Sequence, residues 1–396
     1  MKRLLCSLLA AVSLISLTAC GGPSPASSLP EPAHAAGSGS ASGGADTDVP
    51  PIDEASARIN ALLAEMTLEE KVGQLFFARV PETDAAADVS EYHLGGYILF
   101  GRDTKDKTAN ELIQAIHSYQ EAAKIPLLIG VDEEGGTVVR VSSNPHLRSK
   151  KFPSPQQLYA AGGMEAVLRD THEKDVLLKA LGFNVNLAPV ADVSVNSGDF
   201  IYPRAFGQDA NATAEYVRAV VGQMRSDGMG SVLKHFPGYG NNADTHTGIA
   251  VDNRSLEQFE ASDFLPFQAG LEAGGDTAAV LVSHNIVDAL ATEADAGLPA
   301  SLSPSVHSTL ELMMNAAGGG VMMTDDLAMD AVKDYARDGS AAVMALQAGN
   351  SLLIASDYRA QIPQVLAAVE DGTLEEPLID GLCAQVLRWK LALGLL

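Results

Sequence analysis

Eight short apolar runs, rich in β-branched and aromatic residues, recur along the chain and are separated by longer segments of mixed polarity. They lie at residues 75–80, 95–100, 127–132, 184–190, 231–236, 278–284, 320–325 and 351–356. Each run has the length and composition of a buried strand. Several of the segments between them repeat apolar residues three and four apart, as helices packed on a sheet do: residues 110–123, 164–181, 210–227 and 256–273. Strands alternating with helices predict a parallel sheet, and eight such pairs predict an α/β fold of the (β/α)8 TIM-barrel type.

Polar side chains stand where five of these runs end. They are Asp132 after the third run, Asp192 after the fourth, Lys234 and His235 on the fifth, His284 on the sixth, and Asp325 with Asp326 after the seventh. In a barrel of this type the working residues lie at the C-terminal ends of the strands. We therefore expect these side chains to meet at one rim and to form a site.

The first twenty residues differ from the rest of the chain. Lys2 and Arg3 precede an apolar stretch over residues 4–17, and small residues then lead to Cys20. A transmembrane helix is the alternative interpretation, but it needs about 20 apolar residues, and this stretch is shorter. The pattern predicts a lipoprotein signal peptide over residues 1–19, with Cys20 as the lipid-bearing N-terminus of a mature protein anchored outside the cytoplasm.

The segment that follows is poor in large apolar residues. Residues 20–53 consist mainly of Gly, Ser, Ala and Pro, a composition that predicts a flexible tether. Residues 54–396 remain as one folded domain, which only the lipid would attach to the membrane. With Cys20 lipidated and Cys6 in the signal peptide, Cys383 is the one cysteine left, so we expect no disulfide and a buried helix position for Cys383.

Charge narrows the range of partners. The chain has 50 acidic and 26 basic residues and a formal net charge of −24. Such an excess of negative charge argues against nucleic acid as a partner, because the phosphate backbone would be repelled.

The densest group of reactive side chains lies in the middle of the chain. The fifth run leads into Lys-His-Phe-Pro-Gly-Tyr-Gly at 234–240, and Asp-Thr-His follows at 244–246. This segment resembles the signature of glycoside hydrolase family three, in its β-N-acetylhexosaminidase branch. The resemblance implies that Lys234 and His235 bind sugar hydroxyls, which supply the acceptors that a buried cation needs. Tyr239 stands where the family commonly has His, and a tyrosine can also donate a hydrogen bond or stack on a sugar face.

Three other segments carry the same resemblance. They read Asp-Glu-Glu-Gly-Gly-Thr-Val-Val-Arg at 132–140, Arg-Ala-Phe-Gly at 204–207 and Thr-Asp-Asp-Leu-Ala-Met at 324–329. The resemblance implies that Asp132, Arg140 and Arg204 bind the terminal sugar and that Asp325 is the nucleophile. The alternatives are an acidic turn for the first segment and an arginine packed on the barrel for the second.

The remaining acidic residues of these segments have expected structural roles. We expect Glu134 to orient its loop rather than touch substrate. By the family resemblance Asp192 is structural, and Asp326 is expected to cap the following helix.

A retaining glycosidase needs a nucleophile and a second group that protonates the leaving oxygen and then activates water. In this branch of the family the second group is a His paired with an Asp, which Asp244 and His246 match. An imidazole can serve as both acid and base near neutral pH, and Asp244 would orient it. A metal-binding pair of His235 and His246 is the alternative, but no cluster with ligand spacing surrounds them, and the resemblance implies no cofactor.

The resemblance thus implies a retaining exo-β-N-acetylglucosaminidase. It would remove non-reducing terminal GlcNAc from cell-wall fragments of the muropeptide type or from other β-GlcNAc glycans. Two alternatives stay open: a phosphorylase on the same scaffold, since a neutral His does not repel phosphate, and a glycan-binding lipoprotein without activity.

Overall fold

The protein is described here by a computed structural model that covers residues 53–242, 250–329, 332, 335 and 340–396. The chain divides into two compact units, Met1–Pro51 and Ile52–Leu396. Every described residue belongs to the second unit. The predicted signal peptide, Cys20 and most of the predicted tether lie outside the described residues, and so do Asp244 and His246.

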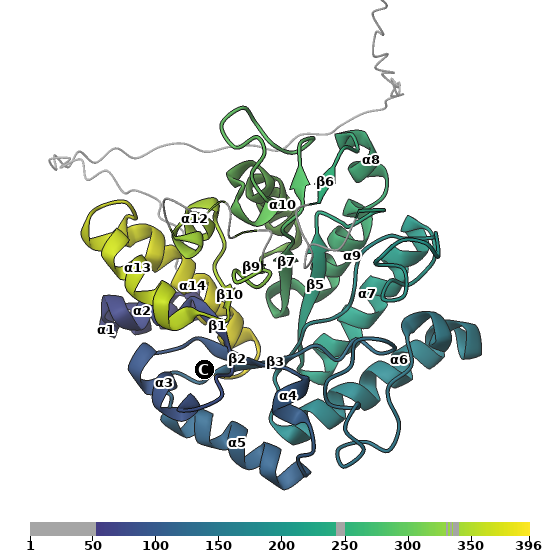
Figure 1. Cartoon of the computed structure of the whole chain (residues 1–396), viewed down its shortest axis with the longest axis horizontal. Coiled ribbons are helices and arrows are strands. Elements are labelled where there is room, and N and C mark those ends of the chain that lie inside the picture. The colour runs from purple at the N-terminus through teal and green to yellow at the C-terminus, as the bar shows by residue number, and fades with distance from the viewer. Residues whose placement is uncertain (1–52, 243–249, 330–331, 333–334, 336–339) are drawn as a thin grey trace, which may run out of the picture. The chain divides into compact units, whose positions relative to one another are not determined.

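The eight predicted strands form one parallel sheet (Figure 1). Its order is β10-β1-β2-β3-β4-β5-β7-β9, and contacts between β9 and the residue before β10, such as Thr324 N–H to Leu352 O (3.1 Å), bring its two ends together. The predicted (β/α)8 barrel is confirmed. The strands are β1 (Phe76–Arg79), β2 (Gly96–Leu99), β3 (Leu128–Val131), β4 (Val185–Asn186), β5 (Gly230–Phe236), β7 (Ala278–Val282), β9 (Val321–Thr324) and β10 (Leu353–Ala355).

Helices surround this sheet (Figure 1). They are α1 (Glu54–Glu65), α2 (Leu68–Gln74), α3 (Ala85–Tyr92), α4 (Gly101–Thr104), α5 (Ala109–Ala122), α6 (Pro155–Leu181), α7 (Ala210–Asp227), α8 (Leu256–Ala261), α9 (Phe264–Gly274), α10 (Pro304–Ala317), α12 (Ala341–Ala348), α13 (Tyr358–Glu370) and α14 (Glu376–Ala392). Their ends follow local chemistry. For example, Asp209 caps the first turn of α7 through the Ala212 N–H, and α7 ends at Gly228, whose φ of 70° suits glycine.

Two helices differ from the sequence prediction. The helix expected at 164–181 forms the longer part of α6, and a break at Gly162 and Gly163 separates it from an additional short helix that begins at Pro155. Ser154 and Gln157 form a capping box for this additional helix, and proline suits its first turn. The helix expected at 256–273 is two helices, α8 and α9. Pro266 lies in the first turn of α9, where its missing N–H costs nothing, whereas one continuous helix would place it in the interior.

A second small sheet was not predicted. β6 (Val251–Asp252) and β8 (Ile286–Val287) pair in parallel, and the Ile286 N–H also bonds Ala250 O at 2.8 Å. These strands are only two residues long, too short for an alternating pattern to mark them. They hold the chain directly after residues 243–249, the segment that contains the predicted acid/base pair Asp244 and His246.

The barrel interior is filled by side chains that alternate along each strand. A Cβ added to Gly130 on β3 would come within 2.5 Å of the Phe77 ring and 3.0 Å of Leu187, so Phe77 points into the barrel from β1. Strand alternation then directs Arg79, two residues later, toward the mouth of the barrel.

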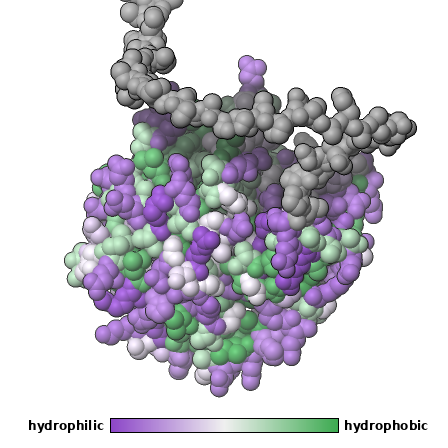
Figure 2. Space-filling view, turned by 180° about the vertical axis from the view of Figure 1, so that it is seen from behind, coloured by the Kyte–Doolittle hydropathy of each residue, from purple (hydrophilic) through white to green (hydrophobic). Residues whose placement is uncertain are grey.

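Outside the barrel, one face shows hydrophilic residues around small hydrophobic patches (Figure 2). In the described part of the chain, no helix is both long enough and apolar enough to span a bilayer.

Candidate active site

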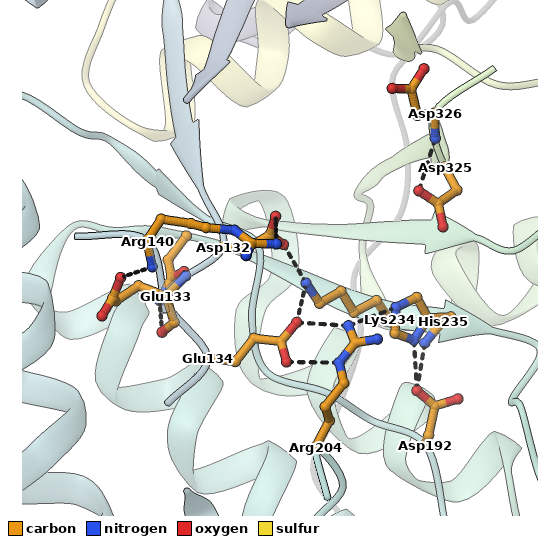
Figure 3. Close-up of polar contacts among 11 residues, drawn as sticks. Asp132, Glu133, Glu134, Arg140, Asp192, Arg204, Lys234, His235, Asp325 and Asp326 are labelled. Carbon is orange, nitrogen blue, oxygen red and sulfur yellow. Dashed lines mark hydrogen bonds and ion pairs between the residues drawn. The ribbon is translucent and has the colours of Figure 1, made fainter. Parts of the chain in front are cut away.

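Six of the predicted site residues line a single cavity of about 350 Å³ at the C-terminal ends of the barrel strands. They are Asp132, Arg140, Arg204, Lys234, His235 and Asp325 (Figure 3). These residues come from strands or loops that are up to 193 positions apart in the chain (325 − 132). The fold therefore brings together every described residue that the sequence assigned to substrate or catalysis.

Lys234 is the central cation of the site. It lies near the end of β5 and is buried, and its Nζ bonds Asp132 Oδ1 and Glu134 Oε1, each at 2.6 Å. Burial alone would raise the pKa of Glu134, but Arg204 and Lys234 outweigh it and hold that pKa well below its ordinary value. The two cations thus hold Glu134 in its carboxylate form.

Arg204 approaches the same carboxylate from the connection between β4 and α7. Its Nε and Nη2 donate to the two oxygens of Glu134 at 3.0 and 2.8 Å, which is a bidentate pair. Burial opposes its charge, yet the Glu134 carboxylate raises the pKa of Arg204 above its usual value. Two cations and one carboxylate therefore form a rigid group on one side of the cavity (Figure 3).

The adjacent Glu133 and Glu134 have different roles, and the loop-orienting role predicted for Glu134 belongs to Glu133. Glu133 is fully buried and accepts the backbone N–H groups of Arg140, Val141 and Ser142 at 2.8, 2.7 and 3.2 Å. Glu133 therefore orients the loop that carries Arg140. Glu134, which was expected to do this, instead balances Lys234 and Arg204.

His235 is held in one orientation by its neighbours. Its Nδ1 lies 2.8 Å from Asp192 Oδ2, and its backbone N–H donates to the same oxygen at 3.1 Å. Its Nε2 faces Arg204 Nη2 at 3.1 Å. Because a guanidinium can only donate, Nε2 must accept, and Nδ1 carries the proton that Asp192 receives. Both ring nitrogens thus have protein partners, so neither is free to bind a metal ion or to donate a proton to substrate.

Tyr239 lies behind His235 rather than in the cavity lining. Its ring is 1% exposed and meets the His235 ring edge-on at 5.1 Å between centroids, and its backbone N–H donates to Asp192 Oδ1 at 2.7 Å. In this structure Tyr239 is therefore not placed to stack on a sugar in the cavity. Its ring supports His235, a role that no local sequence signal reveals.

Asp325 follows β9 on another side of the cavity (Figure 3). Its backbone N–H bonds Val282 O on β7 at 3.2 Å, and its Oδ1 accepts the Asp326 N–H at 2.8 Å. The turn thereby fixes a carboxylate that emerges directly from a buried strand.

Asp326 and His284 support this turn. Asp326 Oδ1 accepts the Ala328 N–H at 3.0 Å, as a capping residue does, and Asp326 also bonds the Ser356 hydroxyl after β10. His284 is fully buried, with Nδ1 2.7 Å from Ser301 Oγ and Nε2 3.1 Å from Asp326 O. His284 therefore lies next to the turn that carries Asp325 and Asp326, as its place at a strand end predicted, but it is not among the residues that line the cavity.

Two further predictions concern cysteine and metal ligands. Cys383 lies buried in α14, as expected, and burial raises the pKa of its thiol to about 12. Within residues 53–242, 250–329 and 340–396, no three His, Cys, Asp or Glu side chains cluster closely enough to hold a metal ion.

Comparisons with known proteins agree with this geometry. The family model described as glycosyl hydrolase family 3 N terminal domain matches residues 67–389. A β-hexosaminidase of Stenotrophomonas maltophilia (strain K279a) is 32% identical over 307 residues, covering 75% of this chain and 86% of that protein. A β-hexosaminidase of Xylella fastidiosa (strain M23) is 34% identical over 249 residues, covering 61% and 69%.

A solved structure shows the same architecture. The glycoside hydrolase family 3 β-N-acetylglucosaminidase from Paenibacillus sp. str. FPU-7 superposes with a TM-score of 0.76 at 31% identity. The match covers 83% of this chain and 63% of that one, so this chain spans less than two thirds of the Paenibacillus enzyme.

Proposed function

The chain belongs to glycosyl hydrolase family 3, and we propose that it is a retaining exo-β-N-acetylglucosaminidase that hydrolyses terminal β-linked GlcNAc. The observation that carries this proposal is one cavity in which Asp325 faces a fixed set of sugar-binding groups. The barrel interior is a packed core and not a pore, so a substrate enters this cavity from the mouth only. Such a cavity suits a single terminal sugar.

The described residues suit a neutral sugar ring. Asp132 offers carboxylate lone pairs to hydroxyls, while Arg204 and Lys234 offer donors whose positions Glu134 fixes. Groups held in this way need little reorganisation when the substrate binds, which favours the transition state.

The proposed reaction has two steps. In the first, an Asp325 oxygen attacks the anomeric carbon and the glycosidic bond breaks, while His246 gives its proton to the departing oxygen. In the second, His246 removes a proton from water, whose oxygen attacks the anomeric carbon and releases Asp325. Asp244 would orient His246 and stabilise its charged form. His235 is committed to Asp192 and Arg204, which supports a different residue as the proton donor.

The first test is the nucleophile. Asp325→Ala should abolish turnover of an aryl β-GlcNAc while circular dichroism stays unchanged, because no other carboxylate replaces the covalent route. An activated fluorosugar should label Asp325 in the unmodified protein, as read by mass spectrometry of peptides. Asp326→Ala is a useful comparison, because it changes the neighbouring carboxylate. A label on Asp326 or Asp132 would disprove the assignment.

Substrate range and location are the finer parts of the proposal. We infer that the natural substrates are cell-wall fragments and that the lipid on Cys20 anchors the enzyme to the outer side of the cell membrane, since residues 1–20 have the signal pattern. A panel of aryl β-GlcNAc, β-GalNAc, β-glucoside and muropeptides would define the substrate range. Free GlcNAc as product in phosphate buffer would exclude phosphorolysis.

A further inference from the structure

Met329 is a methionine of the active-site cavity that the proposed mechanism does not use. It follows Asp325 and Asp326 in the chain, and its backbone N–H donates to Asp326 O at 3.0 Å, which closes the turn after β9. Its side chain is partly exposed and lines the same cavity of about 350 Å³ as these two carboxylates. A thioether therefore borders the space in which the proposed nucleophile works.

The other described methionines are better protected. Some are buried, and the rest are partly exposed but pack on the hydrophobic core of the barrel. The buried ones are Met66, Met224, Met229, Met314, Met322 and Met323, and the partly exposed ones are Met164, Met313 and Met344. Met329 is the one described methionine that lines the cavity, and its side chain does not pack on that core.

Cysteine does not compete with Met329 for an oxidant in the described part of the chain. The reactivity of a sulfur toward oxidants follows its exposure and, for cysteine, the fraction present as thiolate. Cys383 is buried in α14, and burial raises the pKa of its thiol to about 12. An oxidant that enters the cavity therefore meets Met329 as an accessible sulfur, while the thiol of Cys383 stays protonated and covered.

Oxidation would change the chemistry of the cavity wall. A peroxide transfers one oxygen atom to the sulfur, which loses two electrons and becomes a sulfoxide, while the peroxide is reduced to water. The product is polar, whereas apolar residues such as Leu281 and Ile354 line the same cavity. The sulfoxide oxygen loses its water when a sugar fills the cavity, and a polar group buried without a hydrogen-bond partner costs free energy. Oxidation of Met329 should therefore weaken substrate binding.

We propose that Met329 is a site of reversible oxidation by peroxides and that its sulfoxide lowers the activity of the enzyme. A methionine sulfoxide reductase reverses the step: two thiols of the reductant become a disulfide, and the sulfoxide oxygen leaves as water. The inference rests on the proposed function for its activity readout, but the sulfoxide can also be located without measuring activity. The location proposed for the enzyme, outside the cytoplasm, is an oxidising environment.

The test treats the unmodified protein with hydrogen peroxide. Peptide mass spectrometry should find the gain of one oxygen atom first at Met329, and kcat/KM on aryl β-GlcNAc should fall as the sulfoxide forms there. The fully oxidised enzyme should lose about 5- to 100-fold in kcat/KM, the cost of burying one polar group without a partner. Methionine sulfoxide reductase with dithiothreitol should restore both the thioether and the activity.

Met329→Leu is compared with Met313→Leu. Leucine has a similar volume and no sulfur, so Met329→Leu should keep after peroxide treatment the activity that it has before. Met313 is partly exposed on α10 and packs on the core, so Met313→Leu should lose activity as the unmodified protein does. Added GlcNAc should slow the oxidation of Met329 but not that of Met313, because a sugar in the cavity covers only Met329.

Several outcomes would overturn the inference. Equal loss of activity in Met329→Leu and in the unmodified protein would show that another residue is responsible. Complete conversion of Met329 to its sulfoxide without loss of activity would show that the modification has no effect, and a loss that the reductase cannot restore would show that it is not reversible. An untreated protein that does not hydrolyse aryl β-GlcNAc would instead refute the proposed function, and oxidation of Met329 no faster than that of Met313 would refute the inference by itself.

Discussion

Glu134 balances the charge of the sugar-binding group. It is buried and bonds both Lys234 and Arg204, which otherwise would stand side by side as two positive charges. Removing one partner of a buried ion pair typically costs about 3–5 kcal/mol, because the remaining charge is left uncompensated. The side chain therefore matters both for stability and for the placement of the donors.

Glu134→Gln should lower both stability and activity. We expect a fall of several degrees in Tm and a loss of kcat/KM on aryl β-GlcNAc of about 100-fold or more. The pKa of Glu134 is depressed in the folded protein, so its contribution to stability is complete above about pH 5 and is lost only as the pH falls below the pKa of an unfolded Glu, near 4.3. The Tm difference between the two proteins, from thermal melts, should accordingly be constant from pH 5 to 8.

Glu272→Gln provides the comparison for this prediction. It breaks an ion pair at the surface, where such pairs contribute little, so its Tm should hardly move. A Glu134→Gln enzyme with unchanged kcat/KM would show that the position of Lys234 and Arg204 does not depend on this carboxylate.

The sequence predicted which of the described residues line the cavity, but it did not predict the separate roles of the neighbouring Glu133 and Glu134. Glu133 and Glu134 are chemically alike, and their directions depend on the turn at Gly135 and Gly136, whose φ values are 101° and 66°. This turn directs Glu133 onto the N–H groups of the returning loop and leaves Glu134 facing Lys234. A one-dimensional motif carries no information on that choice.

At the scale of elements, an ion cluster around Arg254 fixes the chain on both sides of residues 243–249. Arg254 donates to Gly238 O at 3.0 Å and to Asp263 Oδ2 at 2.7 Å, and it pairs with Asp252 on β6. Asn242 donates to the same Asp252 at 2.6 Å. A Cβ on Gly240 would come within 2.6 Å of the Arg254 guanidinium, so glycine at this position leaves room for the cluster.

If His246 is the proton donor, His246→Ala should lower the hydrolysis rate most for substrates with poor leaving groups. General acid catalysis typically accelerates a reaction about 10² to 10⁴-fold. Acidic phenols need protonation less, so the variant should still form the glycosyl-enzyme rapidly from aryl substrates that release them. Because the second step is slow in the variant, the glycosyl-enzyme should accumulate and give a pre-steady-state burst of phenol. Asp244→Ala should show a smaller defect. Arg254→Met should also lower hydrolysis more for poor than for good leaving groups, but by a smaller factor. Arg254 does not act on the substrate, and it affects catalysis only by holding the residues on both sides of 243–249. Loss that is equal for good and poor leaving groups, without a burst, would assign the proton to another residue.

A second pair of elements, α6 and α7, contains a buried acid outside the site. Asp175 on α6 is fully buried, and its oxygens accept no hydrogen bond from any described residue. Burial, with a further contribution from Asp227, raises the pKa of Asp175 to about 8. An unfolded Asp loses its proton near pH 4. The folded protein therefore binds the extra proton between these values, and its stability falls as the pH rises from about 4 to 8.

Asp175→Asn should stabilise the protein at alkaline pH. The amide resembles the protonated acid and cannot ionise, so the gain in Tm should be small at pH 5 and largest at pH 8.5. Thermal melts across this range would measure it. Glu165→Gln, at an exposed position of the same helix, should show no such trend. A gain that is the same at every pH would mean that ionisation of Asp175 is not the cause.

The strands were predictable because each is a continuous apolar run, and the elements that were missed lack such a signal. β6 and β8 are two residues long, and β6 includes the exposed Val251. The break between α8 and α9 was marked by Pro266, but the apolar spacing continues across it and favours one helix. Long-range pairing decides the first case and the local effect of the proline decides the second.

At the scale of the whole molecule, the proposed attachment to the membrane depends on the lipid on Cys20 and not on the barrel domain. Cys20→Ala should release the protein into the soluble fraction, because the proposed tether has no apolar segment that could hold a bilayer. Fractionation followed by a carbonate wash would measure this. Catalytic rates on a small aryl substrate should stay the same. Retention of the variant in washed membranes would refute the lipid anchor.

The closure of the barrel also has a consequence for synthesis. β10 lies between β1 and β9, and its pairing joins Phe76 to Leu353, at nearly opposite ends of the domain. The turn that presents Asp325 is tied to this last strand through Asp326 and Ser356. A nascent chain that has already produced every motif residue still lacks the strand on which its nucleophile depends. Such contacts between distant residues form slowly, so a growing polypeptide stays inactive until its final strand emerges and closes the ring.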